Sequence, residues 1–495
     1  MKTHDTKAQQ GVDVWITYHL PEIYLAVAFL LTFALCMLTP PFFVPDEIAH
    51  SSREIQIGHG GLIGRQFPEG VGGLVDVNAK QVMDGFGRIQ GEIMQRYPNS
   101  SRRPDGRVTE AQLAPFRELR WAHRSVFMPF QNTAVYPPFL YIPQAAGWRI
   151  GEAANLTILH TLLLARLFAA MSALAVGWLA LRFYAGGRWV LFTYLLLPSE
   201  LGLSASCSQD ALLFAVAGLV AALVSRAIYC RRLFTILELI AVTTLLLVTI
   251  EARLPYLPLA LFLILPSLSL RDTTWRGLVP ASLGILIILG VSSAWAKMVK
   301  PLGIFTHPLA NPALQIAFLR THPFNGAWNL LKCTVLLTPL MIPQALEVLG
   351  TLDVFPPLPI YALLAAGLTG VALLSPREQL TSWRGRGLLV FTIIAVCVCL
   401  TLAEYIIFTP PGGGWVYGLQ GRYYLPLVPL PFLLLRPSTR VNEKTRFGLS
   451  ARWREVLLIV SGLVFLSAVL YTPWVAARGF YNLGLLSALR ASALR

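Results

Sequence analysis

A pair of acidic residues and a histidine follow the first long apolar run of the chain. They lie in residues 40–50, which read PPFFVPDEIAH and include Asp46, Glu47 and His50. A carboxylate at a membrane surface can take a proton from a hydroxyl nucleophile, and a neighbouring like charge with partial burial raises its pKa and makes it a better base. This segment therefore predicts a site at the mouth of a membrane helix, with Asp46 as the base and Glu47 in support.

Two isolated arginines with polar neighbours are candidates for the same site. Arg253 follows one apolar run, Asp210 begins another, and Gln420, Arg422 and Tyr423 precede a third. Any of these alone reads as an interfacial anchor. Arginine also binds phosphate through a planar, permanently charged fork. A base with phosphate clamps fits sugar transfer from a lipid-linked phosphosugar, in which the lipid phosphate leaves as the anomeric carbon is attacked.

Two other interpretations of the acidic pair stay open. Asp46 and Glu47 suit a divalent metal such as Mg²⁺ or Mn²⁺, but two adjacent side chains cannot fill a coordination sphere, so no metal ligand is assigned. The order Pro45, Asp46, Glu47 is also typical of a helix start, where acidic groups favour the N-terminal dipole. Capping and catalysis are compatible roles for Asp46.

The composition indicates a polytopic helical membrane protein. The 495 residues are 55% hydrophobic and 13% charged, with a mean hydropathy of +0.60. Apolar runs near the length of a membrane span recur along the chain. The expected spans are 22–42, 156–181, 188–204, 211–229, 233–250, 255–270, 277–296, 357–374, 387–408, 423–436 and 455–471. The net charge of +15 belongs to loops and indicates no nucleic-acid partner.

The distribution of Lys and Arg orients these spans. With the N-terminus in the cytoplasm, basic residues gather in the inside connections, and the short outside connections are almost free of them. The basic connections are 182–188, 226–232, 271–276, 375–386 and 436–454. The apolar stretch 328–347 conflicts with this orientation if it spans, so we interpret it as a re-entrant or interfacial segment of an outside region, 297–356. Eleven spans follow, and a twelfth is the alternative.

The chain is expected to be one integral-membrane domain, 1–495, with a large first outside loop, 43–155. Val82, Phe86 and Ile89 in that loop follow helical spacing and predict an amphipathic interfacial helix. Arg166 and Glu238 lie within expected spans, where each would be either a buried pair member or a substrate contact.

The sequence resembles the GT-C superfamily of lipid-phosphosugar-dependent glycosyltransferases, and within it a bacterial family of polytopic proteins with a PDExxH motif after the first span. The resemblance extends over nearly the whole chain. Its pieces, in order, are PDEIAH (45–50), YPPFLYIP (136–143), LPSELGLSASCSQDAL (197–212), RLPYLPLALFLILP (253–266), LGTLDVFPPLPIY (349–361) and GLQGRYYLPLVPLP (418–431).

The resemblance implies an inverting transferase in the bacterial inner membrane, with its site on the extracytoplasmic face. The donor would be a polyprenyl-phosphate sugar, and the acceptor a glycan, lipid or protein. The family's acidic residue maps onto Asp46, and Arg422 with Tyr423 is placed to bind phosphate. Arg253 stands where many relatives have lysine, so the position keeps a cation. His50, Asp210 and Gln420 would line the cavity.

Other functions remain alternatives. A transporter or flippase of lipid-linked saccharides would need charged groups near mid-membrane, where Arg166 and Glu238 are candidates. A glycan ligase or polymerase would be expected to carry its dominant outer loop late in the chain, whereas here the large loop comes first. A lipid-binding scaffold leaves the gathering of Asp46, Arg253 and Arg422 unexplained. Convergence of these three groups in one cavity would favour the transferase.

Overall fold

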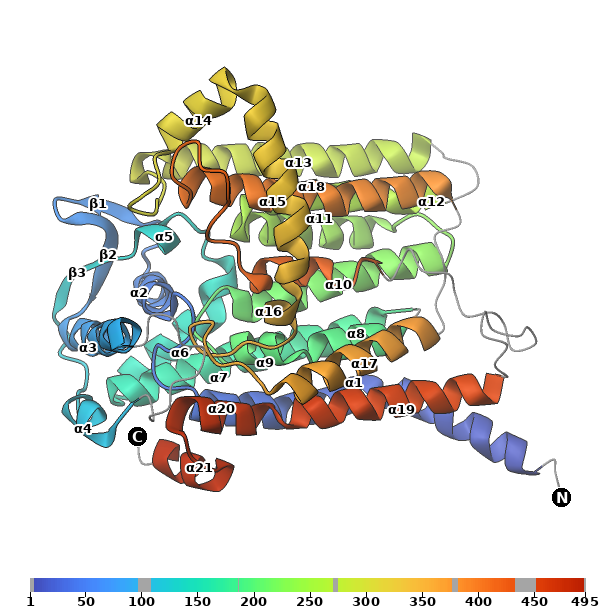
Figure 1. Cartoon of the computed structure of the whole chain (residues 1–495), viewed down its shortest axis with the longest axis horizontal. Coiled ribbons are helices and arrows are strands. Elements are labelled where there is room, and N and C mark those ends of the chain that lie inside the picture. The colour runs from blue at the N-terminus through green and yellow to red at the C-terminus, as the bar shows by residue number, and fades with distance from the viewer. Residues whose placement is uncertain are drawn as a thin grey trace.

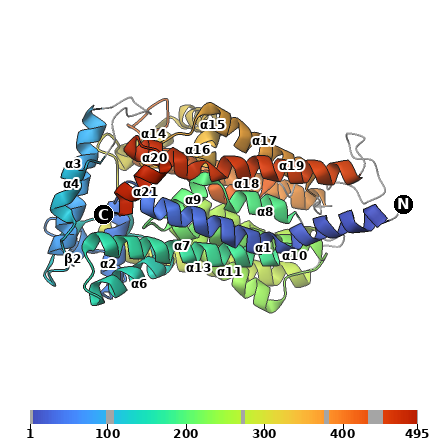
Figure 2. The same cartoon turned by 90° about the horizontal axis from the view of Figure 1, so that it is seen from below.

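Long helices run side by side along one direction in the computed structural model, and a smaller group of elements covers one end of them (Figure 1). The structure describes residues 4–96, 108–185, 187–269, 275–375, 382–431 and 451–493. The N-terminus lies at the end of the bundle opposite the smaller group, as a second view also shows (Figure 2). We call the smaller group, residues 47–153, the cap.

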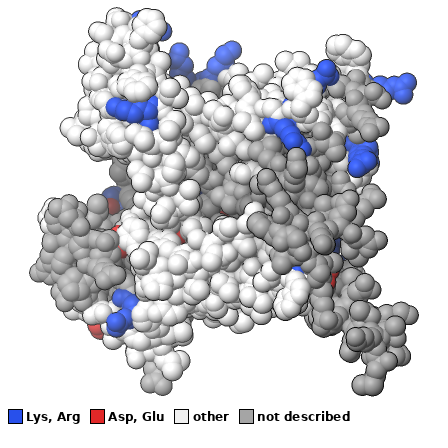
Figure 3. All heavy atoms as spheres, turned by 45° about the vertical axis from the view of Figure 1, so that its right-hand side comes forward, with Lys and Arg blue, Asp and Glu red and all other residues white. Residues whose placement is uncertain are grey.

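Six helices of the described part are long and apolar enough to cross a membrane. They are α1 (His4–Leu38), α7 (Ile158–Phe183), α10 (Asp210–Tyr229), α13 (Trp275–Val299), α18 (Trp383–Ile407) and α19 (Ala451–Leu470), which α20 (Thr472–Tyr481) continues. Figure 3 shows a face of the bundle that is mostly free of charged side chains, with Lys and Arg at its margins. The expected helical polytopic membrane fold is confirmed.

Several expected spans are shorter or broken helices. Residues 188–204 form α8 (Arg188–Leu195) and α9 (Pro198–Ser204). Residues 255–269 lie in the 3₁₀ helix η3 (Leu254–Leu263) and α12 (Leu265–Ser269), and the described part of 423–436, residues 423–431, includes most of the 3₁₀ helix η5 (Gly421–Leu427). A proline inside a helix removes one backbone hydrogen bond and clashes with the preceding turn, and each of these segments contains prolines. Hydropathy identified apolar segments here, but not continuous helices.

The shorter helices α11 (Ile236–Ala252) and α17 (Leu358–Leu374) match the expected spans 233–250 and 357–374. Whether each shorter segment crosses the membrane stays a prediction, and so does the count of eleven. The basic connections that orient the chain include 271–274, 376–381 and 436–450, which lie outside the described residues. The chain ends with α21 (Leu485–Ala493).

The cap contains the predicted amphipathic helix. This helix, α3 (Val77–Arg96), buries Val82, Phe86 and Ile89, as the helical spacing predicts. The other cap helices are α2 (Glu47–Gly58), α4 (Glu110–Leu113), η1 (Ala114–Phe116), α5 (Gln131–Ala134), η2 (Phe139–Tyr141) and α6 (Ile142–Ala153). Helix α6 packs along α7 and so joins the cap to the bundle.

The cap also contains a three-stranded antiparallel sheet that the sequence pattern did not predict. Its order is β1 (Arg65–Phe67), β2 (Gly70–Asp76) and β3 (Ser125–Pro129). Glycine-rich β2 lacks the alternation of a typical strand, and its partner β3 lies far along the chain. A Cβ atom at Gly72 would come within 2.0 Å of the Met128 carbonyl oxygen, so glycine is required for this close pairing.

The segment 328–347 differs from the long helices in direction. It falls in α15 (Pro323–Leu340) and α16 (Ile342–Leu346), which follow η4 (Lys300–Leu302) and α14 (Pro312–Thr321). Figure 1 shows α15 lying across the bundle while its neighbours run along it. Helix α15 also exposes Phe324, Trp328, Leu331 and Leu340. Its interfacial placement stays a prediction.

Candidate active site

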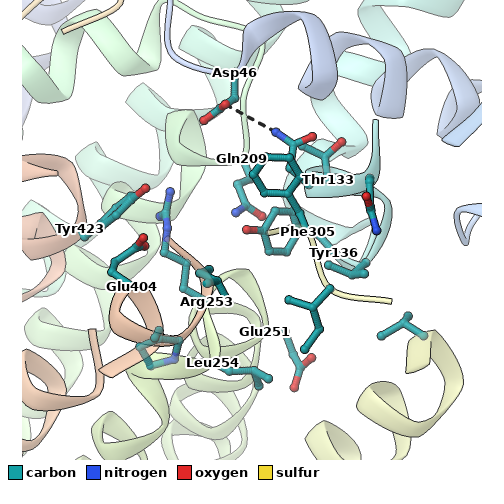
Figure 4. A pocket seen from close by; sticks show the side chains of 18 of the residues that line it. Asp46, Thr133, Tyr136, Gln209, Glu251, Arg253, Leu254, Phe305, Glu404 and Tyr423 are labelled. Carbon is teal, nitrogen blue, oxygen red and sulfur yellow. Dashed lines mark hydrogen bonds between the residues drawn. The ribbon is translucent and has the colours of Figure 1, made fainter. Parts of the chain in front are cut away.

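A cavity of about 690 Å³ lies where the cap meets the bundle (Figure 4). Its lining comes from the turn before α2, from α5 and its neighbours, and from α11, η3, α13, α18 and η5. One part is polar and contains Asp46, His50, Arg253 and Arg422. Another part is apolar and is formed mainly by α13, α18 and the residues after η4. Figure 4 shows Asp46 toward one end and Glu251 toward the other.

Four charged residues form one continuous chain at the polar part of this region. Asp46 Oδ2 lies 2.8 Å from Arg422 Nη2, and Arg422 Nη1 lies 3.2 Å from Asp210 Oδ2. Arg253 binds both oxygens of Asp210, at 2.7 and 3.0 Å. The Asp210 and Arg422 side chains are 0% and 3% exposed, whereas that of Asp46 is 45% exposed. Two positive and two negative charges therefore balance, and of the two carboxylates only that of Asp46 lines the cavity.

The backbone at Asp46 explains where its carboxylate points. Helix α2 begins at Glu47, as expected, but Asp46 has a left-handed backbone (φ 61°) and its side chain makes no capping hydrogen bond. The carboxylate instead reaches Arg422 of η5, and Oδ1 lies 3.5 Å from Asn132 Nδ2. The capping role suggested by the sequence is therefore wrong for this side chain.

The electrostatics of Asp46 also differ from the expectation. Burial acts to raise the pKa of Asp46, but the Arg422 guanidinium, with a smaller effect from His50, lowers that pKa below the usual 3.8. The expectation that the like charge of Glu47 raises the pKa of Asp46 is therefore wrong for the protein without ligand. Asp46 is a carboxylate at neutral pH, in the state that accepts a proton or a hydrogen bond.

Gln420 and Tyr423 hold the two arginines in place. Gln420 Oε1 accepts a hydrogen bond from Arg422 Nε at 2.7 Å. The Tyr423 ring lies under both guanidinium groups, 4.7 Å from that of Arg253 and 5.5 Å from that of Arg422. Cation–π contacts of this kind favour a fixed, partly desolvated cation. The expected substrate-binding residues from η5 thus converge with Arg253 and Asp210.

His50 lines the same cavity and is fixed by the cap. Its Nδ1 lies 2.8 Å from the Tyr141 hydroxyl, and the residue is 3% exposed. Burial lowers the pKa of His50 to about 4, although the negative charges of Asp46 and Asp210 act to raise it. His50 is therefore neutral at physiological pH and offers a hydrogen bond to a ligand, not a charge.

The pKa of His50 predicts a pH dependence of stability. Between pH 6.5 and about 4, the unfolded chain binds a proton that the folded chain does not, so the free energy of unfolding falls as the pH falls. His50 alone should lower the free energy of unfolding by up to about 3 kcal/mol over this pH range. We expect His50→Gln to lack this part of the pH dependence. The measurement is the unfolding midpoint of purified protein at pH 7 and pH 4.5. Parallel losses in both proteins would contradict the assignment.

Glu47 lies apart from this cavity, which corrects its expected role beside Asp46. Its side chain is fully buried and binds Arg166 of α7 at 2.8 and 2.6 Å. Glu47 Oε1 also accepts a hydrogen bond from the Cys207 backbone N–H at 3.0 Å. Arg166 in turn donates to the carbonyl oxygens of Thr39 and Pro40. Glu47 therefore ties the start of α2 to the bundle and has no oxygen free for chemistry.

The structure adds cavity residues that sequence reasoning missed. Glu404 of α18 lines the cavity. The sequence could have indicated this residue, because an acidic side chain inside an expected span is uncommon. Lys300 is an exposed cation in the cavity lining. Arg166 and Glu238 do not line the cavity. Glu238 is paired with Arg232, at 2.6 Å.

A metal is not supported by the residues that the structure describes. Among them, no group of three or more His, Cys, Asp or Glu side chains is arranged to hold a metal ion. Asp46 Oδ2 already accepts a hydrogen bond from Arg422, and both oxygens of Asp210 accept hydrogen bonds from Arg253 and Arg422. We therefore derive no step through a metal.

A family model described as predicted membrane protein (DUF2142) matches residues 29–431. No curated protein matches the chain. The crystal structure of ArnT from Cupriavidus metallidurans bound to undecaprenyl phosphate is similar, with 14% sequence identity, 95% of this chain and 74% of that chain covered, and a TM-score of 0.41. A likeness at that TM-score supports no conclusion about activity.

Proposed function

This chain belongs to the family of predicted membrane proteins DUF2142, and we propose that it is an integral-membrane glycosyltransferase of the GT-C type. The donor is a polyprenyl-phosphate sugar, and the acceptor is a glycan, lipid or protein at the outer leaflet of the bacterial inner membrane. One observation carries the proposal: Asp46, Arg253 and Arg422 line a single cavity that also has an apolar wall.

The two parts of the cavity suit the two parts of such a donor. Trp295 and Val299 of α13 face the cavity together with Leu400 and Ile407 of α18, and this apolar wall suits a polyprenyl chain. The arginines and hydrogen-bonding side chains suit a phosphate and a sugar. Lys300 adds a cation to the lining without an ion pair to any described residue. A soluble sugar nucleotide would leave the apolar wall unused.

The proposed reaction is an in-line displacement at the anomeric carbon. Asp46 accepts the proton of an acceptor hydroxyl, and that oxygen bonds to the anomeric carbon while the bond from this carbon to the phosphate oxygen breaks. The electron pair leaves with the polyprenyl phosphate, whose added charge Arg253 and Arg422 stabilise. Attack opposite the leaving group inverts the configuration of the anomeric carbon.

Arg422 couples donor binding to the basicity of Asp46. In the free protein this guanidinium contacts both Asp46 and Asp210. A donor phosphate that takes over part of Arg422 weakens the pairing of Asp46 and raises the pKa of that carboxylate. Asp46 then becomes a stronger base only when the donor is in place. Before the donor binds, the low pKa of Asp46 keeps this carboxylate from taking up a proton that no reaction would use.

The transporter alternative has less support. The charged groups within the bundle that would serve it are already paired, Arg166 with Glu47 and Glu238 with Arg232. Membranes containing the protein, incubated with a labelled polyprenyl-phosphate sugar, test the choice directly. The transferase forms a labelled acceptor and releases polyprenyl phosphate. Movement of intact donor between leaflets without such products would defeat the proposal.

Loss of Arg253 should weaken binding of the lipid phosphate. Hydrogen bonds to charged groups contribute about 1.5–3 kcal/mol, so we expect Arg253→Gln to weaken binding of polyprenyl phosphate by roughly 10- to 100-fold. Arg253→Lys retains the cation, so its affinity for polyprenyl phosphate should fall less. Native mass spectrometry of purified protein with added polyprenyl phosphate measures the effect. Arg149→Gln, at an exposed arginine of the cap, is the matched control, and equal losses in both variants would contradict the role.

A further inference from the structure

The cavity contains a carboxylate that the proposed reaction does not use. Glu404 of α18 lines the cavity and is only 8% exposed. Its Oε2 atom is buried and has no hydrogen-bond partner among the residues that the structure describes. Figure 4 shows Glu404 beside Tyr423 and near Arg253. A buried carboxylate oxygen without a donor is costly, so a ligand that brings donors would complete this site.

The backbone of Gly418 keeps this carboxylate in place. Gly418 has a left-handed backbone (φ +88°), and a Cβ atom there would lie 2.5 Å from Glu404 Oε2. No side chain larger than glycine fits between them without displacing the carboxylate. Oε2 is thus packed against the chain, and Glu404 lines the cavity with the rest of its carboxyl group.

The nearby arginines do not satisfy Glu404. Both terminal nitrogens of Arg253 bind Asp210, and the three guanidinium nitrogens of Arg422 bind Asp46, Asp210 and Gln420. Glu404 interacts with these arginines through space and not through a hydrogen bond. Its acceptor capacity therefore remains open in the protein without ligand.

The surroundings of Glu404 distinguish it from the other free carboxylate in the cavity. Glu404 interacts electrostatically with Arg253, Arg422 and Asp46, the three groups at the proposed reaction centre. Glu251 also lines the cavity and has an unpartnered Oε1 among the described residues, but its neighbour is Ser292. A sugar held between the base and the phosphate clamps would therefore meet Glu404 and not Glu251.

We propose that Glu404 recognises the transferred sugar by accepting hydrogen bonds from its hydroxyl groups. This inference rests on the proposed glycosyltransferase function and names the residue that separates a glycosylated donor from bare polyprenyl phosphate. The carboxyl oxygen of Glu404 that is not packed against Gly418 can accept a hydrogen bond from a ring hydroxyl. A site built to bind hydroxyl groups discriminates strongly against a ligand that lacks them, because its buried acceptors then stay unpaired.

Loss of Glu404 should affect the binding of the two lipids differently. Glu404 makes no hydrogen bond to the arginines that would hold the phosphate, so Glu404→Gln should bind bare polyprenyl phosphate as tightly as the wild type. The same substitution removes the preferred acceptor for the sugar, so binding of the glycosylated lipid should weaken by roughly tenfold. A residue that only supports the fold would change both affinities in the same direction.

The experiment uses purified full-length protein in lipid nanodiscs. The probes are polyprenyl phosphate and polyprenyl phosphate linked to glucose, galactose or mannose, with the ratio of apparent Kd values as the readout. We expect the wild type to bind at least one glycosylated lipid roughly tenfold more tightly than bare lipid, and Glu404→Gln to bring that ratio near one. The Tm of Glu404→Gln should not fall, because an unpartnered buried carboxylate has been replaced by a neutral isostere.

Glu347→Gln is the matched control. Glu347 is also buried and has two oxygens without partners among the described residues, but it does not line the cavity. Its substitution should leave the ratio unchanged. If Glu404→Gln keeps the wild-type ratio of Kd values, or if the wild-type ratio is already near one, the inference is overturned while the proposed function stands. If the wild type binds neither lipid, the proposed function falls with it.

Discussion

Replacement of Asp46 with asparagine is expected to lower the rate of sugar transfer by about 100- to 10,000-fold, the range that a positioned general base contributes. Asparagine has nearly the same shape and can still accept a hydrogen bond from Arg422, but it cannot take a proton from the acceptor. Asp46 makes no capping hydrogen bond to α2, so the fold should not depend on its charge. Turnover of labelled polyprenyl-phosphate sugar in membranes measures the effect.

Donor binding provides the discriminating readout for Asp46. Without this carboxylate the chain of four charges carries a net positive charge, so polyprenyl phosphate should bind Asp46→Asn at least as tightly as the wild type. Asp84→Asn is the matched control, because Asp84 is an exposed cap residue that pairs with Lys80. Normal turnover by Asp46→Asn defeats the assignment. Loss of donor binding together with turnover would indicate a structural role instead.

Replacement of Glu47 with glutamine is expected to destabilise the protein by about 3–5 kcal/mol, the cost of leaving one member of a buried ion pair without its partner. Arg166 is 3% exposed in its side chain, and Glu47 is its only carboxylate partner among the described residues. The start of α2, which presents Asp46 and His50 to the cavity, would lose its connection to α7. The Tm in detergent and the monodisperse yield report the change.

A double substitution separates stability from chemistry at Glu47. Glu47→Gln with Arg166→Met removes both members of the pair and should recover part of the lost stability, because no uncompensated charge stays buried. Glu118→Gln, at an exposed cap residue, is the control for loss of a carboxylate. A stable, well-folded Glu47→Gln protein with no transfer activity would restore the catalytic role that the sequence suggested.

Some differences between expectation and structure had a signal in the sequence. The broken spans contain prolines, among them Pro198, Pro258 and Pro426, and these mark where a helix must be interrupted. Glu404 lies inside the expected span 387–408, where an acidic residue indicates function. The sheet of the cap had no comparable signal, because the glycines of β2 are explained only by the close approach of β3.

The sequence by itself determined the membrane class, most of the long helices, and seven of the eight expected site residues that meet at or beside one cavity. Hydropathy and helical period are properties of neighbouring residues, so a linear reading is sufficient for them. Only the tertiary structure decided which charges pair. Asp46 meets Arg422 across 376 residues, and Glu47 meets Arg166 across 119. Two adjacent carboxylates thus have different surroundings, one at the cavity and one in a buried ion pair, because buried charges require partners and the packing of helices decides which partners lie within reach.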